Sequence, residues 1–251
     1  MRQVKIHTGT LLAAGLIAGL AGCGSSDDGG SGAGPSGAGR PAAAAEPQQS
    51  GRQRAEIATV RGGRIAVYKQ KGDGAVWKTL SSPNAMGATR VFLVEAKDGG
   101  WLKVLLPVRP NGSTGWVKAS DVGLSSTSHR VEIDPKAFTF TVFDGDKVLR
   151  TGKVATGEGG TPTPAGRFYF TELVKPPNPN GGYGAYAFGL SGFSPTLKTF
   201  AGGPGQLAVH GTDKASALGG KASHGCVRVS NDDITWMAKN LAIGTPVVVK
   251  A

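Results

Sequence analysis

The chain has 251 residues, 41 of them glycine, and a formal net charge of +11, from 28 lysine and arginine residues against 17 aspartate and glutamate residues. This length suits one or two folded domains, and the glycine excess favours linkers and turn-rich β structure over a helical bundle. Two cysteines are too few for a disulfide-dense scaffold or a four-cysteine zinc site. The basic residues are spread along the chain without a nucleic-acid-binding motif, so we expect no nucleic-acid partner.

Residues 1–22 predict a signal peptide. Two cations near the start precede an apolar run at residues 11–20, which is shorter than the roughly 20 apolar residues of a membrane-spanning helix. The sequence Leu20-Ala21-Gly22-Cys23 resembles the bacterial lipobox. That resemblance implies acylation of Cys23 and a lipid anchor on the extracytoplasmic face of a bacterial membrane. An ordinary secretory signal with an incidental cysteine is the alternative.

Residues 23–55 predict a flexible tether beginning with the lipidated Cys23, because Gly, Ser, Ala and Pro cannot bury enough apolar surface to offset chain entropy. Residues 56–127 predict a small β module. Short segments rich in Val, Leu, Trp and Tyr alternate there with Gly, Pro and Asn turns. These segments are residues 64–69, 76–80, 90–96, 101–108 and 115–119. The sequences around Trp101 and Trp116 resemble bacterial SH3-like modules, which implies either contact with the cell wall or a spacer role.

Residues 128–251 predict a second β unit with one helix. The expected strands are residues 130–133, 137–143, 147–155, 167–174, 206–210 and 245–250. Ser230 is the expected N-cap of the helix, with Asp233 as its capping-box partner, and Gly244 is expected to end it. Residues 175–205 are rich in Gly and Pro, and a loop of that length is typical of a functional lid.

His210 and the turn around Cys226 carry the candidate chemistry. A free thiol is only a few per cent thiolate at pH 7, so it needs a neighbouring base to act as a nucleophile. His210 can supply that base, Gly225 permits close approach of a carbonyl, and the turn that starts at Ser223 can direct backbone N–H groups at an oxyanion. This combination is typical of acyl transfer.

The same residues allow two alternative interpretations, a structural cysteine and a metal site. A lone cysteine is often a small buried hydrophobic residue. His210, His224 and Cys226 could instead ligate a metal, but these three would be the whole supply of ligands. We therefore predict neither a metal nor a cofactor.

The pattern His210-Gly211-Thr212 followed by Ser223-His224-Gly225-Cys226-Val227-Arg228 resembles the L,D-transpeptidase catalytic domain of bacterial cell-wall synthesis. The resemblance covers residues 128–251 and includes residues 161–166 and 230–232. It implies a mainly β fold, with the small SH3-like β-barrel followed by an L,D-transpeptidase-type β-sandwich and one C-terminal helix. Some members carry Asn where this chain has Arg228.

The resemblance also implies roles for individual residues. Cys226 would attack a tetrapeptide stem at the L-centre of diaminopimelate, release D-Ala and form a thioester, which a diaminopimelate side-chain amine of a second stem resolves. His210 would be the base, oriented by a backbone carbonyl near Gly211, with Asp213 as another candidate. Backbone N–H groups of His224, Gly225 and Cys226 would hold the oxyanion, and His224 would orient Ser223 or the substrate.

Several residues are candidates for contact with the substrate, and the resemblance also implies partners. Arg228 is a candidate for a stem carboxylate, and Tyr183, Tyr186, Phe188 and Ser191 are candidates for substrate contact, with core packing as the alternative. Peptidoglycan stems are the expected partners, anionic wall polymers a further one, and the protein is expected to be a monomer. Family resemblance also leads us to expect that carbapenems acylate Cys226.

Other functions remain open at this point. An L,D-carboxypeptidase or an enzyme that attaches proteins to peptidoglycan would share the acyl-enzyme and differ in the acceptor. A sortase also places His before Cys before Arg, but its His lies much further upstream. A non-enzymatic wall-binding lipoprotein would not need the pair His210 and Cys226.

Overall fold

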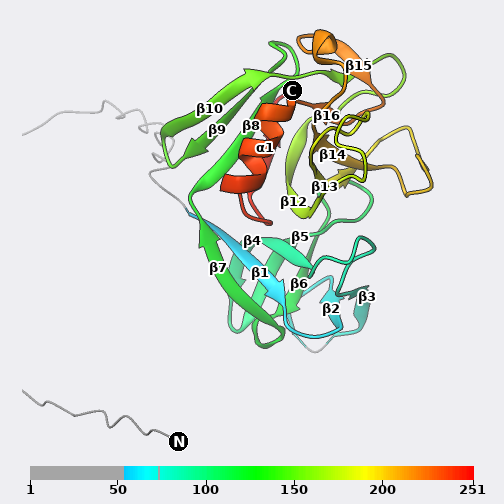
Figure 1. The fold of residues 1–251 in the computed structure, drawn as a ribbon. Helices are drawn as coiled ribbons and strands as arrows, with labels where there is room; N and C mark the ends of the chain where they lie inside the picture. Colours follow the sequence, from blue (N-terminus) through cyan, green and yellow to red (C-terminus); the bar gives the residue numbers. More distant parts are fainter. Residues whose placement is uncertain (1–53, 73) are drawn as a thin grey trace, which may run out of the picture. The chain divides into compact units, whose positions relative to one another are not determined.

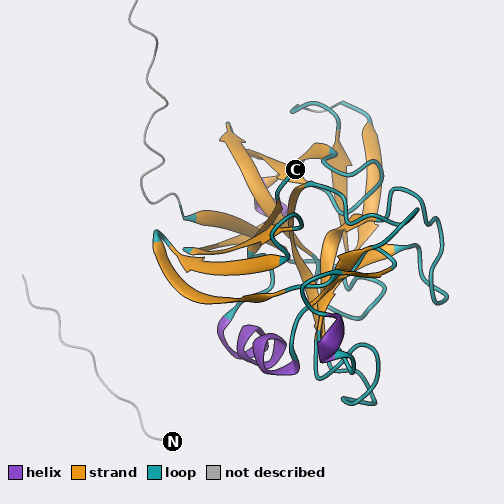
Figure 2. Ribbon diagram, turned by 90° about the horizontal axis from the view of Figure 1, so that it is seen from above, coloured by secondary structure: helices purple, strands orange, loops and turns teal. Residues whose placement is uncertain are grey.

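The computed structural model describes residues 54–72 and 74–251, which form two β units (Figure 1). The predicted signal peptide, Cys23 and the predicted tether up to residue 53 lie outside the described residues. Strands and loops make up most of the described chain, with one longer helix beside the strands (Figure 2). No helix in this described part is long and apolar enough to cross a membrane.

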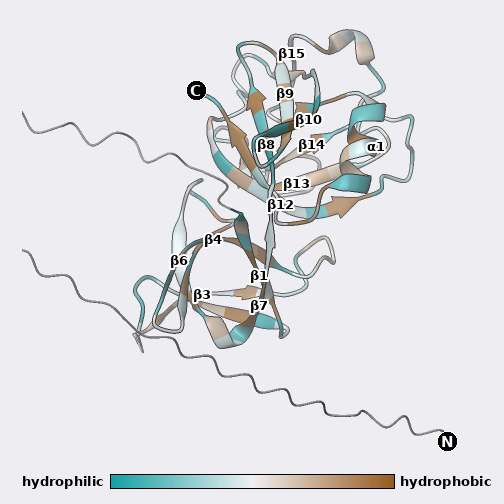
Figure 3. Ribbon diagram, turned by 90° about the vertical axis from the view of Figure 1, so that its left-hand side faces the viewer, coloured by the Kyte–Doolittle hydropathy of each residue, from teal (hydrophilic) through white to brown (hydrophobic). Residues whose placement is uncertain are grey.

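The first unit is a seven-stranded sheet in the order β3-β2-β6-β5-β4-β1-β7. Its strands are β1 (Ala55–Val60), β2 (Arg64–Tyr68), β3 (Val76–Ser81), β4 (Val91–Asp98), β5 (Trp101–Leu105), β6 (Thr114–Lys118) and β7 (Val122–Thr127). These strands curl around one another (Figure 3). The buried side chains between them form a cluster that includes Phe92, Val104 and Val117. The five predicted strands are present, whereas β1 and β7, which pair with each other, were not predicted.

The second unit is an eight-stranded sheet in the order β10-β9-β8-β17-β12-β13-β14-β16. Its strands are β8 (His129–Asp134), β9 (Thr139–Asp144), β10 (Lys147–Lys153), β12 (Gly166–Val174), β13 (Ala187–Phe193), β14 (Gln206–His210), β16 (Val227–Arg228) and β17 (Pro246–Val249). A separate two-stranded parallel sheet joins β11 (Thr156–Gly157) to β15 (Lys221–Ser223). The prediction of a mainly β protein with one C-terminal helix is confirmed.

Strand β12 turns the larger sheet back on itself. Its residues 166–169 pair with β17, and its residues 170–174 pair with β13. The two halves of the sheet therefore close over one apolar core, which contains Val131 and Phe140 from one half and Leu207 and Val227 from the other. This closure gives the sandwich-like arrangement and leaves β14 and β16 at one edge.

Helix α1 (Asn231–Asn240) begins as predicted at Ser230. The Asp233 N–H donates to Ser230 Oγ at 3.0 Å, and the Asp233 carboxylate accepts from Arg150 Nε at 2.6 Å. The buried side chains Ile234 and Met237 pack into the core of the second unit. The helix fixes the segment that directly follows β16.

The prediction that residues 175–205 form one loop is wrong, because they contain β13. Glycines within this strand reflect close packing rather than a turn. A Cβ on Gly189 would lie 1.7 Å from Glu172 Oε1, and one on Gly192 would lie 2.3 Å from the Phe168 ring. The irregular parts of the segment are therefore residues 175–186 and 194–205.

Candidate active site

His210 and Cys226 are held by β14 and β16, which lie side by side in the second unit (Figure 1). His210 is the last residue of β14, and Cys226 directly precedes β16, which pairs in parallel with β14. The register places Val209 opposite Val227, with both side chains buried in the core. Because these two valines anchor their strands in the core, the ends of β14 and β16 lie close together, although residues 211–226 separate the two strands in the chain.

Both side chains line a cavity of about 260 Å³. Its lining residues are Gly182, Tyr183, Phe200, His210, Ser223, His224, Cys226 and Arg228. The cavity thus brings together the predicted nucleophile, the predicted base and a guanidinium group.

Hydrogen bonds fix the turn that presents Cys226. Ser223 Oγ accepts the Gly225 N–H at 3.1 Å and donates to the Cys226 carbonyl oxygen at 2.5 Å. Gly225 has φ of +115°, a conformation that side-chain-bearing residues rarely adopt. The Gly225 N–H, one of the three predicted oxyanion donors, is thus bonded to Ser223 Oγ within the turn.

A second loop supports this turn from behind. Thr163 Oγ1 donates to the Gly225 carbonyl oxygen at 2.8 Å and accepts the Gly157 N–H at 2.9 Å. A Cβ on Gly157 would lie only 2.1 Å from the Thr161 carbonyl oxygen. Thr163 belongs to the Thr-Pro-Thr-Pro motif that contributed to the family resemblance, but the sequence did not indicate this role.

His210 is held as a neutral imidazole. It is 4% exposed, and its Nδ1 lies 2.6 Å from the Gly211 carbonyl oxygen, the kind of acceptor expected from the sequence. Since a carbonyl only accepts, Nδ1 carries the proton and Nε2 keeps its lone pair. Burial lowers the pKa of His210 to about 4, partly offset by this hydrogen bond, and the charge of Arg228 lowers it further. Asp213, the other candidate partner, is exposed.

Asn231 fixes the loop around Gly211. Its Nδ2 donates to the Thr212 carbonyl oxygen at 3.1 Å, and its Oδ1 accepts the Ala185 N–H at 3.1 Å. A Cβ on Gly211 would lie 2.2 Å from Asn231 Oδ1, so only glycine fits there. The start of α1 therefore holds the residue that orients His210.

Cys226 is held as a thiol. Burial raises its pKa above the usual range, although a hydrogen bond with the Ala208 backbone and the charge of Arg228 oppose this effect. A neutral imidazole and a protonated thiol in one cavity suit attack by the sulfur with transfer of its proton to the imidazole.

Of the predicted substrate contacts, Tyr183 and Arg228 line the cavity. The Tyr183 ring lies 4.9 Å from the His210 ring, centroid to centroid, and Arg228 Nε is buried without a hydrogen-bond partner in the described part of the chain.

The other three predicted contacts do not line this cavity and pack within the fold instead. Phe188 is fully buried and stacks on Phe170, and Ser191 Oγ accepts the Tyr169 N–H at 3.1 Å inside the sheet. Tyr186 packs partly against the core. Phe188 and Ser191 belong to β13, which was not predicted, whereas Tyr186 directly precedes this strand.

Phe200, which was not among the predicted site residues, also lines the cavity. Its ring centroid lies 5.3 Å from that of the exposed His224. An aromatic residue in a Gly- and Pro-rich segment was the available signal. Among the described residues, no group of three or more His, Cys, Asp and Glu side chains could hold a metal ion.

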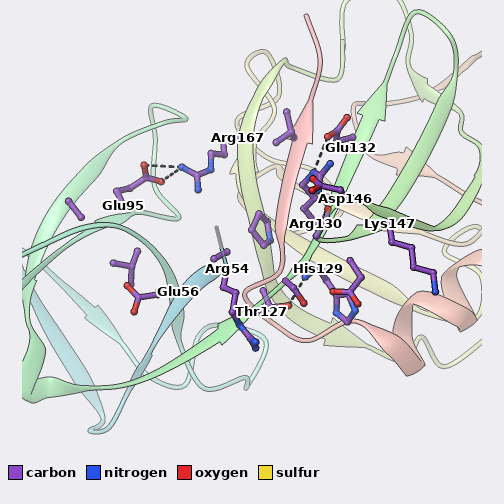
Figure 4. Close-up of a pocket in the computed structure, with 18 of the residues that line it drawn as sticks. Arg54, Glu56, Glu95, Thr127, His129, Arg130, Glu132, Asp146, Lys147 and Arg167 are labelled. Carbon is purple, nitrogen blue, oxygen red and sulfur yellow. Dashed lines mark hydrogen bonds and ion pairs between the residues drawn. The ribbon is translucent and has the colours of Figure 1, made fainter. Parts of the chain in front are cut away.

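A larger cavity, of about 1420 Å³, lies where the first sheet meets β8, β12 and β17 (Figure 4). Charged side chains of both signs line it, and several pair with each other, as in Arg167 with Glu95 and Arg130 with Glu132. Neither His210 nor Cys226 lines this cavity, so the candidate chemistry belongs to the smaller one.

Comparison with known proteins agrees with this geometry. Residues 128–249 match the YkuD family, described as an L,D-transpeptidase catalytic domain. Proteins named as L,D-transpeptidase YkuD, from Bacillus licheniformis and Bacillus subtilis, are each 31% identical over 121 residues, which is 48% of this chain. The chain spans 65% of the length of these relatives.

Solved structures of L,D-transpeptidases also resemble the chain. One from Mycobacterium tuberculosis H37Rv is 15% identical, with a TM-score of 0.45, over 78% of this chain and 98% of that one. One from Mycobacterium smegmatis is 18% identical, with a TM-score of 0.40, over 74% of this chain and 99% of that one.

Proposed function

We propose that this chain, whose residues 128–249 match the YkuD family of L,D-transpeptidase catalytic domains, is a cysteine acyltransferase acting on peptidoglycan stem peptides. The observation that carries the proposal is the pairing of a buried, neutral His210 with the Cys226 thiol in one cavity. The base is thereby buried and the thiol half-buried next to a guanidinium group that can receive a carboxylate.

In the proposed donor step, Cys226 Sγ attacks the carbonyl carbon at the L-centre of diaminopimelate while His210 Nε2 takes the thiol proton. The amides of His224 and Cys226 stabilise the oxyanion. His210 then gives its proton to the departing amine, the C–N bond breaks, and D-Ala leaves. A thioester remains on Cys226.

In the proposed acceptor step, the side-chain amine of a second diaminopimelate attacks the thioester. His210 takes a proton from the attacking nitrogen, the C–S bond breaks, and the thiol of Cys226 re-forms with that proton. Arg228, whose Nε has no partner in the described chain, would bind a stem carboxylate, and Tyr183 would line the stem. The product is a direct cross-link between two diaminopimelate residues.

Incubation of the purified protein with a disaccharide-tetrapeptide, followed by mass spectrometry, tests this proposal. We expect loss of D-Ala and appearance of a cross-linked dimer with the wild type, and neither with Cys226→Ala. Loss of D-Ala without a dimer would indicate an L,D-carboxypeptidase, which uses the same acyl-enzyme with water as the acceptor. Identical products from wild type and Cys226→Ala would refute the mechanism.

Two further parts of the proposal concern the rest of the chain and an inhibitor class. Acylation of Cys23 would hold the enzyme on the extracytoplasmic face of a membrane, and Cys23→Ala should release it into the soluble fraction. Carbapenems should add their mass to the peptide that contains Cys226. Persistent membrane fractionation of the first variant, or an unmodified Cys226 peptide, would contradict the respective part.

A further inference from the structure

The loop at residues 194–205 forms one wall of the catalytic cavity. It connects β13 to β14 (gold in Figure 1) and closes at its base, where the Ser194 N–H donates to the Gly205 carbonyl oxygen at 2.8 Å. Near its tip, Phe200 and Gly203 exchange two main-chain hydrogen bonds of 3.0 and 2.9 Å. Phe200 lines the cavity that contains Cys226. The position of this loop therefore sets the width of the substrate site.

Arg109, from the loop between β5 and β6 of the first unit, holds the base of this loop. Its Nη1 donates to the Ser194 carbonyl oxygen at 2.6 Å, and its Nη2 donates to those of Leu197 and Pro204 at 2.9 and 3.0 Å. Ser194 and Leu197 lie on the outgoing arm of the loop and Pro204 on the returning arm. One guanidinium thus ties the two arms together through charge-assisted hydrogen bonds.

The surroundings of Arg109 are built for this contact. Asn111 pairs with both main-chain groups of Phe193, donating to its carbonyl oxygen at 2.8 Å and accepting its N–H at 2.9 Å. The Arg109 guanidinium also lies 5.0 Å from the centroid of the Phe193 ring. Gly205 has φ of +70°, and a Cβ there would lie 2.3 Å from the Leu197 carbonyl oxygen. Only glycine lets these carbonyls converge on the guanidinium.

The contact differs from the other links between the two units. Arg167 pairs with Glu95, and Asn84 Nδ2 donates to Glu172 Oε2, but Arg167 and Glu172 lie on β12, inside the sheet. Arg109 bonds instead to carbonyls of an irregular loop, which strand pairing does not fix. Its effect should therefore appear in the position of the loop rather than in the stability of the sheet.

We propose that Arg109 is a positioning residue, which fixes the loop at residues 194–205 so that Phe200 stands over the catalytic cavity. The first β unit is then part of the machinery that shapes the substrate site. The proposal rests on the proposed function of that cavity. Lysine cannot replace Arg109, because a single ammonium lacks the planar fork that spans both arms.

Hydrogen exchange tests the hold on the loop without any need for activity. We compare the full chain with Arg109→Ala and Arg109→Lys, and use Arg167→Ala as the matched control that removes another arginine link between the units. The amides of Ser194 and Gly203 should exchange about tenfold faster in both Arg109 variants, since charge-assisted bonds are lost. Exchange at the wild-type rate in the Arg109 variants, or an equal change in Arg167→Ala, would overturn the proposal.

Kinetics then test the effect on the site through D-Ala release from a disaccharide-tetrapeptide. Arg109→Ala should lower kcat/KM about tenfold, mainly through KM, and Arg167→Ala should not. In a Phe200→Ala background, Arg109→Ala should have no further effect, because both changes remove the same wall. Effects that multiply would overturn the assignment to Phe200. If the wild type releases no D-Ala, the proposed function fails, and hydrogen exchange alone decides the role of Arg109.

Discussion

Acid should destabilise this protein through His210 in particular. The folded chain keeps this imidazole neutral because burial lowers its pKa from 6.5 to about 4. The unfolded chain takes up a proton below pH 6.5, whereas the folded chain does not do so until about pH 4. His210 therefore stabilises the fold fully above pH 6.5, and this contribution is lost as the pH falls through that window.

The size of the effect follows from the change in pKa. One pKa unit corresponds to about 1.4 kcal/mol, so the complete loss is about 3 kcal/mol, of which about 2 kcal/mol should be lost between pH 7 and pH 4.5. His210 is only 4% exposed, so solvent screens it little. This loss is a large part of the free energy of unfolding of a folded domain, which is typically about 5–15 kcal/mol.

His210→Gln isolates the contribution, because glutamine does not titrate. We expect urea unfolding followed by tryptophan fluorescence to show that the wild type loses about 2 kcal/mol more than the variant between pH 7 and pH 4.5. Groups other than residue 210 are the same in both proteins, so their contributions cancel in this comparison. Equal losses in the two proteins would refute the assignment of a neutral, buried His210.

Three substitutions away from the reacting groups test the supports of the site and fold. Gly157→Ala should destabilise the protein by about 1–3 kcal/mol and slow D-Ala release, because its Cβ would displace the loop around Thr163 that supports the turn at residues 223–226. Gly160→Ala is the matched control and should do neither, because the space around Gly160 is open. Tyr169→Phe should raise the free energy of unfolding by about 1 kcal/mol, since the buried hydroxyl has no partner in the described chain; a loss in urea unfolding would contradict this. Asp233→Asn should cost about 2 kcal/mol by thermal unfolding, because its arginine partner loses its charge pair; an unchanged Tm would show that the pair contributes nothing.

Local sequence patterns predicted the regular parts of the fold well. Strand β14 has the predicted bounds, and the helix begins at the predicted cap, Ser230. In these segments the hydrophobic period and the capping residue act within a few positions of one another. The strands β1 and β13 were missed for different reasons. Residue 55 of β1 was assigned to the tether and residues 56–60 to the start of the module, where no strand was predicted before residue 64. Strand β13 contains glycines whose neighbours, Glu172 and Phe168, lie on another strand.

For the site, too, the sequence predicted features that arise within a few neighbouring residues, but not those that depend on distant segments of the chain. The motif around Cys226 predicted the turn at residues 223–226, and the structure places His210 and Cys226 in the same cavity. Thr163 and Phe200 reach this cavity or its support only through the pairing of distant segments, which one sequence does not reveal. The engagement of the Gly225 N–H by Ser223 also depends on a side-chain rotamer rather than on sequence spacing.

The central position of β17 has a consequence for how the site around Cys226 forms. β17 lies between β8 and β12, and its Val247 pairs with Val131, far away in the chain. Closing so large a loop before the sheet is complete is slow, so we expect folding at the slow rates of non-local β topologies. Until β17 joins the halves, the core beneath β14 and β16 is incomplete. The arrangement of His210 and Cys226 should therefore form only after this long-range pairing.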